Sequence, residues 1–127
     1  MKNSVWVALD VAPLLRLTGL VIDNAKQLTD FLGSLRQAEW LAIDAEADSL
    51  HSYPEKLCLL QVAIPGRVEL VDPLCGMDLG ALWEALTDRE LMMHGADYDL
   101  RLLQFGHDFV PARIFDTMLA GRLLGRE

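Results

Sequence analysis

Asp44 and Glu46 follow directly on the apolar run at residues 40–43. Side chains alternate between the two faces of an extended strand, so both carboxylates share one face while Ala45 points to the other. In α/β proteins ligands bind at the carboxyl ends of strands, and carboxylate oxygens suit hard cations such as Mg2+ or Mn2+ better than zinc. The spacing therefore predicts a pair of metal ligands. The alternative is an acidic pair that only solvates the junction between strand and loop.

A third carboxylate is predicted from the segment at residues 94–100, His-Gly-Ala-Asp-Tyr-Asp-Leu. It reads as the end of a strand, a turn at Gly95, and an acid in the first turn of a helix, where the helix dipole favours negative charge. If this strand lies beside the first, the acid projects toward Asp44 and Glu46. Three such acids can hold two divalent ions about 3.5–4 Å apart, which clamp the attacking and leaving oxygens of a phosphodiester.

The elements that position these acids can be predicted in chain order. Asn24 with Gln27 resembles a capping box, and the stripe of Leu28, Phe31, Leu32 and Leu35 predicts an amphipathic helix that ends near residue 37. A strand at residues 40–46 and apolar runs at 57–64 and 67–71 follow, the last two separated by a Pro-Gly turn. Short connections favour an antiparallel meander for these three strands.

The second half alternates helices and strands. Asp78 is predicted to cap a helix, and a strand at residues 91–94 leads to a helix at 97–105 with Gly106 as its C-cap. A last strand near residue 114 precedes a helix that Asp116 caps. The order βββαβαβα predicts an α/β fold, a mixed five-stranded sheet flanked by helices. Residues 1–19 carry a weak signal, with a strand at 5–9 and a helical turn at 13–17 as options.

Composition limits the class of protein. A chain of 127 residues, 52% of them apolar, is a single domain with a sizeable core. The net charge of -8 gives no basic surface for non-specific nucleic-acid binding. Asp10, Pro13 and Arg16 interrupt the N-terminal apolar run, which argues against a signal or membrane segment, and two unclustered cysteines are typical of reduced thiols. We therefore expect no membrane association and a cytoplasmic location.

Four motifs together resemble one family, the 3′-5′ exonucleases of the DEDD superfamily, and within it ribonuclease D. Residues 43–46 are similar to its first motif, and residues 94–99 to its second, in which the metal-binding aspartate is the fifth residue after the histidine. That spacing selects Asp99 and not Asp97. Residues 53–61 are similar to the family's second strand, and Phe-Asp-Thr at 115–117 to the segment before a later helix. The resemblance covers about residues 20 to 127.

The resemblance implies an RNase H-like fold and removal of nucleotides from the 3′ ends of single-stranded RNA with two Mg2+ or Mn2+ ions. It implies Asp44, Glu46 and Asp99 as catalytic residues and metal ligands. By the same analogy Leu50 contacts the 3′-terminal nucleotide, a core leucine being the alternative. His51, in the same loop, is a candidate phosphate contact, an ordinary loop residue being the alternative. His94 and Asp116 are interpreted as structural residues.

The sequence departs from the family in one respect. The third motif, Tyr or His followed four residues later by Asp, does not occur after Asp99, where His107 is followed by Pro111. Residues 1–127 therefore resemble a partial exonuclease domain, incomplete at the C-terminus, with residues 1–19 as an extension of unassigned role. We expect weak or absent activity and an uncovered apolar face that favours a homo-oligomer. A catalytically silent module that binds nucleic acid or protein and a proofreading-type DNA exonuclease are the alternatives.

Overall fold

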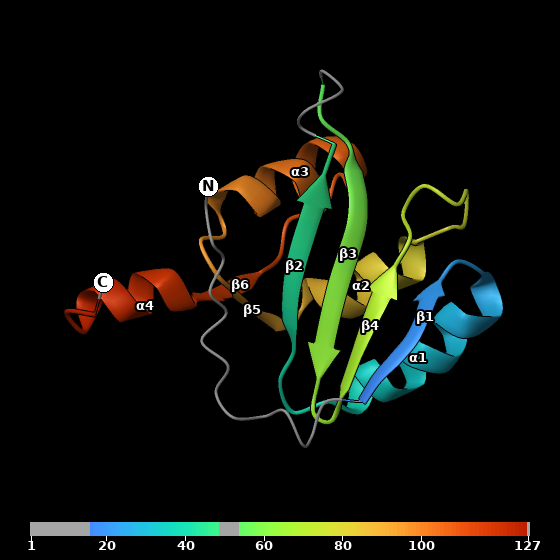
Figure 1. Cartoon of the computed structure of the whole chain (residues 1–127), viewed down its shortest axis with the longest axis horizontal. Coiled ribbons are helices and arrows are strands. Elements are labelled where there is room, and N and C mark those ends of the chain that lie inside the picture. The colour runs from blue at the N-terminus through green and yellow to red at the C-terminus, as the bar shows by residue number, and fades with distance from the viewer. Residues whose placement is uncertain (1–15, 49–53, 127) are drawn as a thin grey trace.

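A computed structural model describes residues 16–48 and 54–126, which form a six-stranded mixed sheet and four helices (Figure 1). The strands are β1 (Arg16–Ile22), β2 (Ala42–Ala47), β3 (Leu57–Ile64), β4 (Arg67–Val71), β5 (Glu90–Met93) and β6 (Arg113–Asp116). The helices are α1 (Ala25–Gln37), α2 (Gly80–Thr87), α3 (Asp97–His107) and α4 (Thr117–Leu123). The strand order is β1-β4-β3-β2-β5-β6.

The predicted meander is present, because β2, β3 and β4 pair antiparallel. β5 joins β2 in parallel through the pair Ala42 and Met92, and β6 extends the sheet in parallel beyond β5. This arrangement confirms the predicted α/β fold with a mixed sheet. It also makes β2 and β5 neighbours, which is the condition for the third carboxylate to approach the first two.

The number of strands was predicted wrongly as five, because the structure adds β1. This strand pairs in parallel with β4, with Ile22 beside Val71. Its start at Arg16 brings residues 16–19 into the sheet, a segment to which the sequence assigned no role. The pairing was not predictable from local periodicity because the partner strand lies far along the chain, beyond α1 and the whole β2–β3 hairpin.

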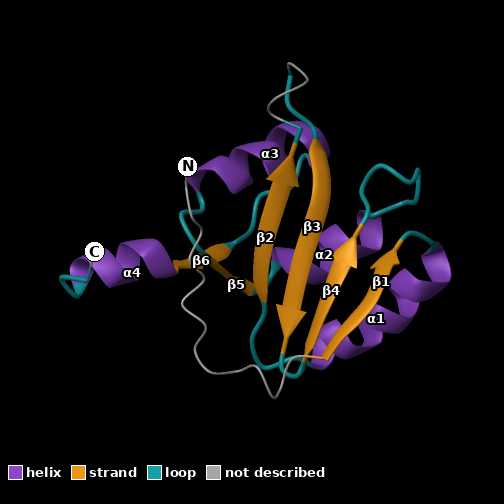
Figure 2. Cartoon of the chain, viewed as in Figure 1, coloured by secondary structure: helices purple, strands orange, loops and turns teal. Residues whose placement is uncertain are grey.

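The core lies between the sheet and helices α1 and α2, which Figure 2 shows together on the far side of the strands. Helix α3 adds Leu102 and Leu103 to this core. The apolar stripe of α1 is buried as predicted, and Leu60, Val62 and Ile64 of β3 face it from the sheet. Side chains that alternate with these three, such as Gln61, lie on the opposite face. We call that opposite face, which carries Asp44, Gln61 and Val68, the open face.

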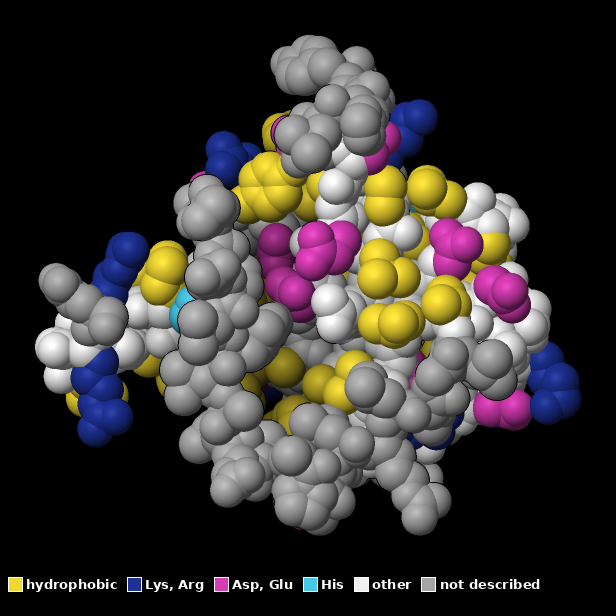
Figure 3. All heavy atoms as spheres, in the orientation of Figure 1, with side chains coloured by type: hydrophobic (Ala, Val, Ile, Leu, Met, Phe, Trp, Pro, Cys, Tyr) yellow, Lys and Arg dark blue, Asp and Glu magenta, His cyan; other side chains and the backbone are white. Residues whose placement is uncertain are grey.

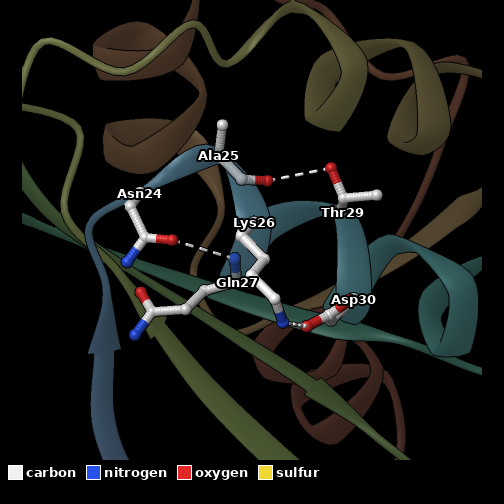
Figure 4. Close-up of polar contacts among 6 residues, drawn as sticks. All are labelled: Asn24, Ala25, Lys26, Gln27, Thr29 and Asp30. Carbon is white, nitrogen blue, oxygen red and sulfur yellow. Dashed lines mark hydrogen bonds and ion pairs between the residues drawn. The ribbon is translucent and has the colours of Figure 1, made fainter.

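The start of α1 confirms the predicted capping box (Figure 4). The Asn24 side chain accepts a hydrogen bond from the backbone N–H of Gln27 at 3.1 Å, and the Gln27 side chain accepts one from the N–H of Asp23 at 3.1 Å. Two N–H groups that the helix itself leaves unpaired are thereby satisfied. The exposed Lys26 and Asp30 add an ion pair one turn apart at 2.9 Å.

Two of the predicted helix ends are wrong. Asp78 accepts the N–H of Gly80 at 2.8 Å, but the residue at the cap of α2 is Leu79, which makes no side-chain cap bond. Helix α3 runs past Gly106 to His107, and Asp108 ends it with a left-handed backbone, φ 51°. Aspartate tolerates this conformation better than most residues, so the expected glycine is not required.

Helix α4 extends sideways from β6, away from the layered body of the protein (Figure 1). None of its residues is buried, and Leu119 and Leu123 are exposed. Its start is nevertheless well held, because Asp116 caps it as predicted. In the part of the chain that is described, no helix has both the length and the apolar content to cross a membrane.

Candidate active site

The first two predicted carboxylates lie side by side on the open face. In β2 the buried side chains of Ile43 and Ala45 point into the core, so Asp44 and Glu46 point the other way. Asp44 is half-buried and Glu46 is exposed. Figure 3 shows Asp and Glu side chains gathered on this face over β2.

Asp44 is flanked by polar side chains from the strands on either side. Gln61 lies directly opposite it on β3, and its amide nitrogen is 3.5 Å from an Asp44 carboxylate oxygen. Burial raises the pKa of the Asp44 carboxyl, while the Ala45 backbone N–H and the charge of His94 lower it. Gln61 was not predicted as a residue of the site. The pairing of Gln61 with Asp44 depends on strand register, which the residues alone did not specify.

Asp99 occupies the first turn of α3, and Asp97 lies two residues before it. Asp99 is 8% exposed, whereas the Asp97 side chain is 86% exposed and pairs with Arg101 at 2.7 Å. A helix turns about 100° per residue, so two acids at this spacing point in different directions. The burial of Asp99 agrees with its choice over Asp97 as the inward-facing acid.

The pKa of Asp99 indicates that the three carboxylates lie close to one another. Burial raises the pKa of Asp99 from its ordinary value of 3.8 to about 6, and the negative charges of Asp44 and Glu46 contribute to the rise, against the opposing Ala45 N–H. A carboxylate raises the pKa of another only at short range. Acids from a strand and a helix that are distant in sequence therefore lie near one another.

This oxygen-only donor set fits a hard divalent cation such as Mg2+ or Mn2+. In residues 16–48 and 54–126, however, no three His, Cys, Asp or Glu side chains are placed so that they could hold one ion together. Asp44, Glu46 and Asp99 thus have the donor atoms that a metal site needs, but their carboxylates are spaced too widely to surround a single ion.

A cavity of about 660 Å³ lies along the exposed side of α3, next to the turn that carries Asp99. Its lining includes Tyr98, Arg101 and Phe105 from α3, and Glu55 from the segment that precedes β3. The Tyr98 hydroxyl donates a hydrogen bond to Glu55 at 2.5 Å. Aromatic rings beside an arginine are the groups on which unpaired bases stack. Leu50 and His51, the predicted substrate contacts, lie outside the described residues.

The raised pKa of Asp99 predicts a cost to stability. The folded state binds the Asp99 proton more tightly than the unfolded chain does, so stability falls as the pH rises from about 4 to about 6, and the full cost is present above that range. A pKa difference of this size corresponds to about 3 kcal/mol. Without metal, Asp99→Asn should therefore stabilise the protein at pH 7.5 by up to about 3 kcal/mol, and by almost nothing at pH 3.5.

Urea unfolding of the parent and the variant at both pH values measures this effect. Asp97→Asn is the matched control, since it removes the same charge from the same helical turn at an exposed position. The control should change stability by less than about 0.5 kcal/mol at either pH. A stabilisation by Asp99→Asn that is equal at both pH values would contradict the electrostatic origin.

Comparison with known proteins identifies the family of this chain. Residues 20–127 match a family model described as 3′-5′ exonuclease. A ribonuclease D from Gluconacetobacter diazotrophicus is 33% identical over 109 residues, which are 84% of this chain and 28% of that protein. Crystal structures of Escherichia coli RNase D and of the catalytic core of RRP6 from Trypanosoma brucei have TM-scores of 0.77 and 0.78, each at 24% identity.

The two structural matches cover 85% and 84% of this chain but only 29% and 31% of those chains. At this identity they show the shared fold. The chain thus spans less than a third of each relative, and the matched portion contains Asp44, Glu46 and Asp99. Because the family model extends over most of the sequence, the chain belongs to the 3′-5′ exonuclease family.

Proposed function

We propose that this chain carries the metal-dependent site of a 3′-5′ exoribonuclease, which hydrolyses the terminal phosphodiester bond at the 3′ end of single-stranded RNA. The observation that carries the proposal is the raised pKa of Asp99, to which the charges of Asp44 and Glu46 contribute. A buried acid whose pKa is raised by neighbouring carboxylates is expensive for a fold, and such groups are typical of functional sites.

In this proposal Asp44, Glu46 and Asp99 hold two divalent ions, Mg2+ or Mn2+. Bound ions would supply the positive charge that activates a water molecule and stabilises the leaving 3′ oxygen. Gln61 supports the site by keeping the Asp44 carboxylate directed along the open face. Asp99 must lose its proton to act as a ligand, and with a pKa of about 6 it does so at neutral pH.

We favour RNA as the substrate because the similar proteins include ribonucleases. The Escherichia coli RNase D structure is that of an exoribonuclease involved in structured RNA processing. The cavity beside α3 adds a physical argument, since its lining presents the exposed rings of Tyr98 and Phe105, on which the bases of a flexible single strand can stack. The net charge of -8 gives little general attraction for duplex nucleic acid.

The deciding experiment is a degradation assay on 3′-labelled single-stranded RNA and DNA of the same sequence, with and without Mn2+. We expect stepwise shortening of RNA that needs Mn2+ and is lost in Glu46→Gln. Turnover should be slow, because residues 100–127 contain no Tyr or His followed four positions later by Asp. A general base of that kind commonly contributes about 10²–10⁴-fold.

The same assay separates the alternatives. Binding of the labelled RNA without any shortening would favour the catalytically silent module. Equal or faster shortening of DNA would favour the proofreading-type exonuclease. Shortening that persists in both Glu46→Gln and Asp99→Asn would contradict the assigned site.

Two further proposals concern the state of the protein in the cell. The exposed leucines of α4 favour a homo-oligomer, which sedimentation equilibrium tests. A cytoplasmic location remains a prediction, and fractionation of the source cells tests it.

A further inference from the structure

The carboxylate of Asp116, outside the group of Asp44, Glu46 and Asp99, accepts more backbone hydrogen bonds than a helix cap requires. Asp116 is the N-cap of α4, and one of its oxygens accepts the N–H groups of Met118 at 2.9 Å and Leu119 at 3.3 Å. The same oxygen accepts the N–H of Gly95 at 3.0 Å, and the other oxygen accepts the N–H of Ala96 at 2.8 Å. Capping α4 alone needs only the first two bonds.

The additional bonds reach the start of the helix that carries Asp99. Ala96 is the residue at the N-cap position of α3, and its own side chain cannot cap the helix. Gly95 before it has a left-handed backbone, φ 67°. Asp116 therefore holds the turn between β5 and α3 from a strand that follows α3 in sequence. Asp99 lies three residues after Ala96, so its position depends on where this turn is held.

The neighbouring Thr117 holds His94 in a similar way. The Thr117 hydroxyl lies 3.1 Å from the backbone oxygen of Met93, and a carbonyl oxygen only accepts, so the hydroxyl hydrogen is directed there. His94 Nδ1 lies 2.9 Å from the same hydroxyl oxygen and must therefore donate its hydrogen. In the neutral ring the hydrogen is then on Nδ1, and Nε2 is left as an acceptor.

Strand register places this ring beside the acids. Ala42 and Met92 are partners on adjacent parallel strands, and Asp44 and His94 each lie two residues further along the chain, His94 just past the end of β5. The charge of His94 acts on the Asp44 carboxyl, so the ring lies near that acid. Hydrogen bonds join Gln61 to Asp44 on one side and His94 to Thr117 on the other.

We propose that Asp116 and Thr117 are positioning residues of the carboxylate site: Asp116 fixes the turn from which Asp99 projects, and Thr117 fixes the orientation and tautomer of His94 beside Asp44. The proposal rests on the proposed function in one respect, that these carboxylates bind metal. It gives a role in supporting the site to Asp116 and Thr117, whose local role is to start α4.

The test for Asp116 is Asp116→Asn. Asparagine caps helices about as well as aspartate, so α4 keeps its cap through the remaining oxygen. The new NH2 group faces the N–H of Ala96, and that contact becomes repulsive. We expect Mn2+ affinity to fall about 10- to 100-fold, the usual effect of removing a residue that supports metal ligands, with helical circular dichroism unchanged. Asp78→Asn, at the start of α2, is the matched control and should leave Mn2+ affinity unchanged.

Amide NMR without metal provides a second readout. The Ala96 signal should move in Asp116→Asn, and so should that of Ala45, whose N–H acts on the Asp99 carboxyl. An unchanged Ala45 signal together with unchanged Mn2+ affinity overturns the role of Asp116. If the parent chain binds no Mn2+, the metal site fails, and the Ala45 signal alone decides the positioning role.

Imidazole ¹⁵N NMR of the neutral His94 ring tests Thr117. The parent and Thr117→Ser should show hydrogen on Nδ1, whereas Thr117→Val, which has the same shape but no hydroxyl, should shift it to Nε2. Restoration by serine separates the hydroxyl from a general effect on folding. The same tautomer in the parent and in Thr117→Val would overturn the assignment.

Discussion

Asp99→Asn is expected to reduce the affinity of the chain for Mn2+ by about 100-fold or more, while Asp97→Asn leaves it unchanged. Residues that only support metal ligands contribute about 10- to 100-fold, so loss of a ligand itself should cost at least as much. Asp99 is buried beside Asp44 and Glu46, and Asp97 is exposed in an ion pair with Arg101. Each substitution removes one negative charge from the same helical turn, so only the direction of the side chain differs.

Isothermal titration calorimetry or Mn2+ electron paramagnetic resonance at pH 7.5 measures this difference. Asp44→Asn should behave like Asp99→Asn, since both remove a carboxylate from the same cluster. Equal losses in Asp97→Asn and Asp99→Asn would mean that Mn2+ responds to overall negative charge and not to a site. In the metal-free protein Asp99→Asn should be more stable than the parent, so loss of affinity through unfolding can be recognised and excluded.

Phe31→Ala is expected to destabilise the fold by about 3–5 kcal/mol. The Phe31 side chain is 0% exposed at the centre of the apolar stripe of α1. The Arg67 guanidinium lies over its ring, 5.2 Å from the centroid, and also pairs with the buried Glu69 at 2.5 Å. Truncation therefore leaves a cavity and also removes the surface against which this ion pair rests. For a domain with about 5–15 kcal/mol of stability this is a large fraction.

Phe105→Ala is the matched control, because the same side chain on α3 is 84% exposed. It should change the free energy of unfolding by no more than about 0.5 kcal/mol. Urea unfolding followed by circular dichroism measures both variants. A small effect of Phe31→Ala would show that α1 is not packed against the sheet as described. A large effect of Phe105→Ala would show that its ring is covered in solution, for example by a second copy of the chain.

Several features followed from the sequence because they depend on neighbours along the chain. The capping residues Asn24 and Gln27 and the stripe that follows them predicted α1 with an end near residue 37, since capping and helical periodicity involve contacts within a few positions. The alternation of an extended strand likewise placed Asp44 and Glu46 on one face. The resemblance to the exonuclease family, carried by four short motifs, agrees with the family match.

Other features were decided only by the tertiary structure, because they depend on which strands become neighbours. Local pattern could not pair β1 with β4, nor place Gln61 opposite Asp44, since register between strands is a property of the assembled sheet. The approach of Asp99 to Asp44 required β5 to lie beside β2. Asp116 was predicted as a cap of α4 from its local position. Its bonds to Gly95 and Ala96 cross the gap between elements some twenty residues apart, and only packing of the complete sheet brings those groups within hydrogen-bond distance.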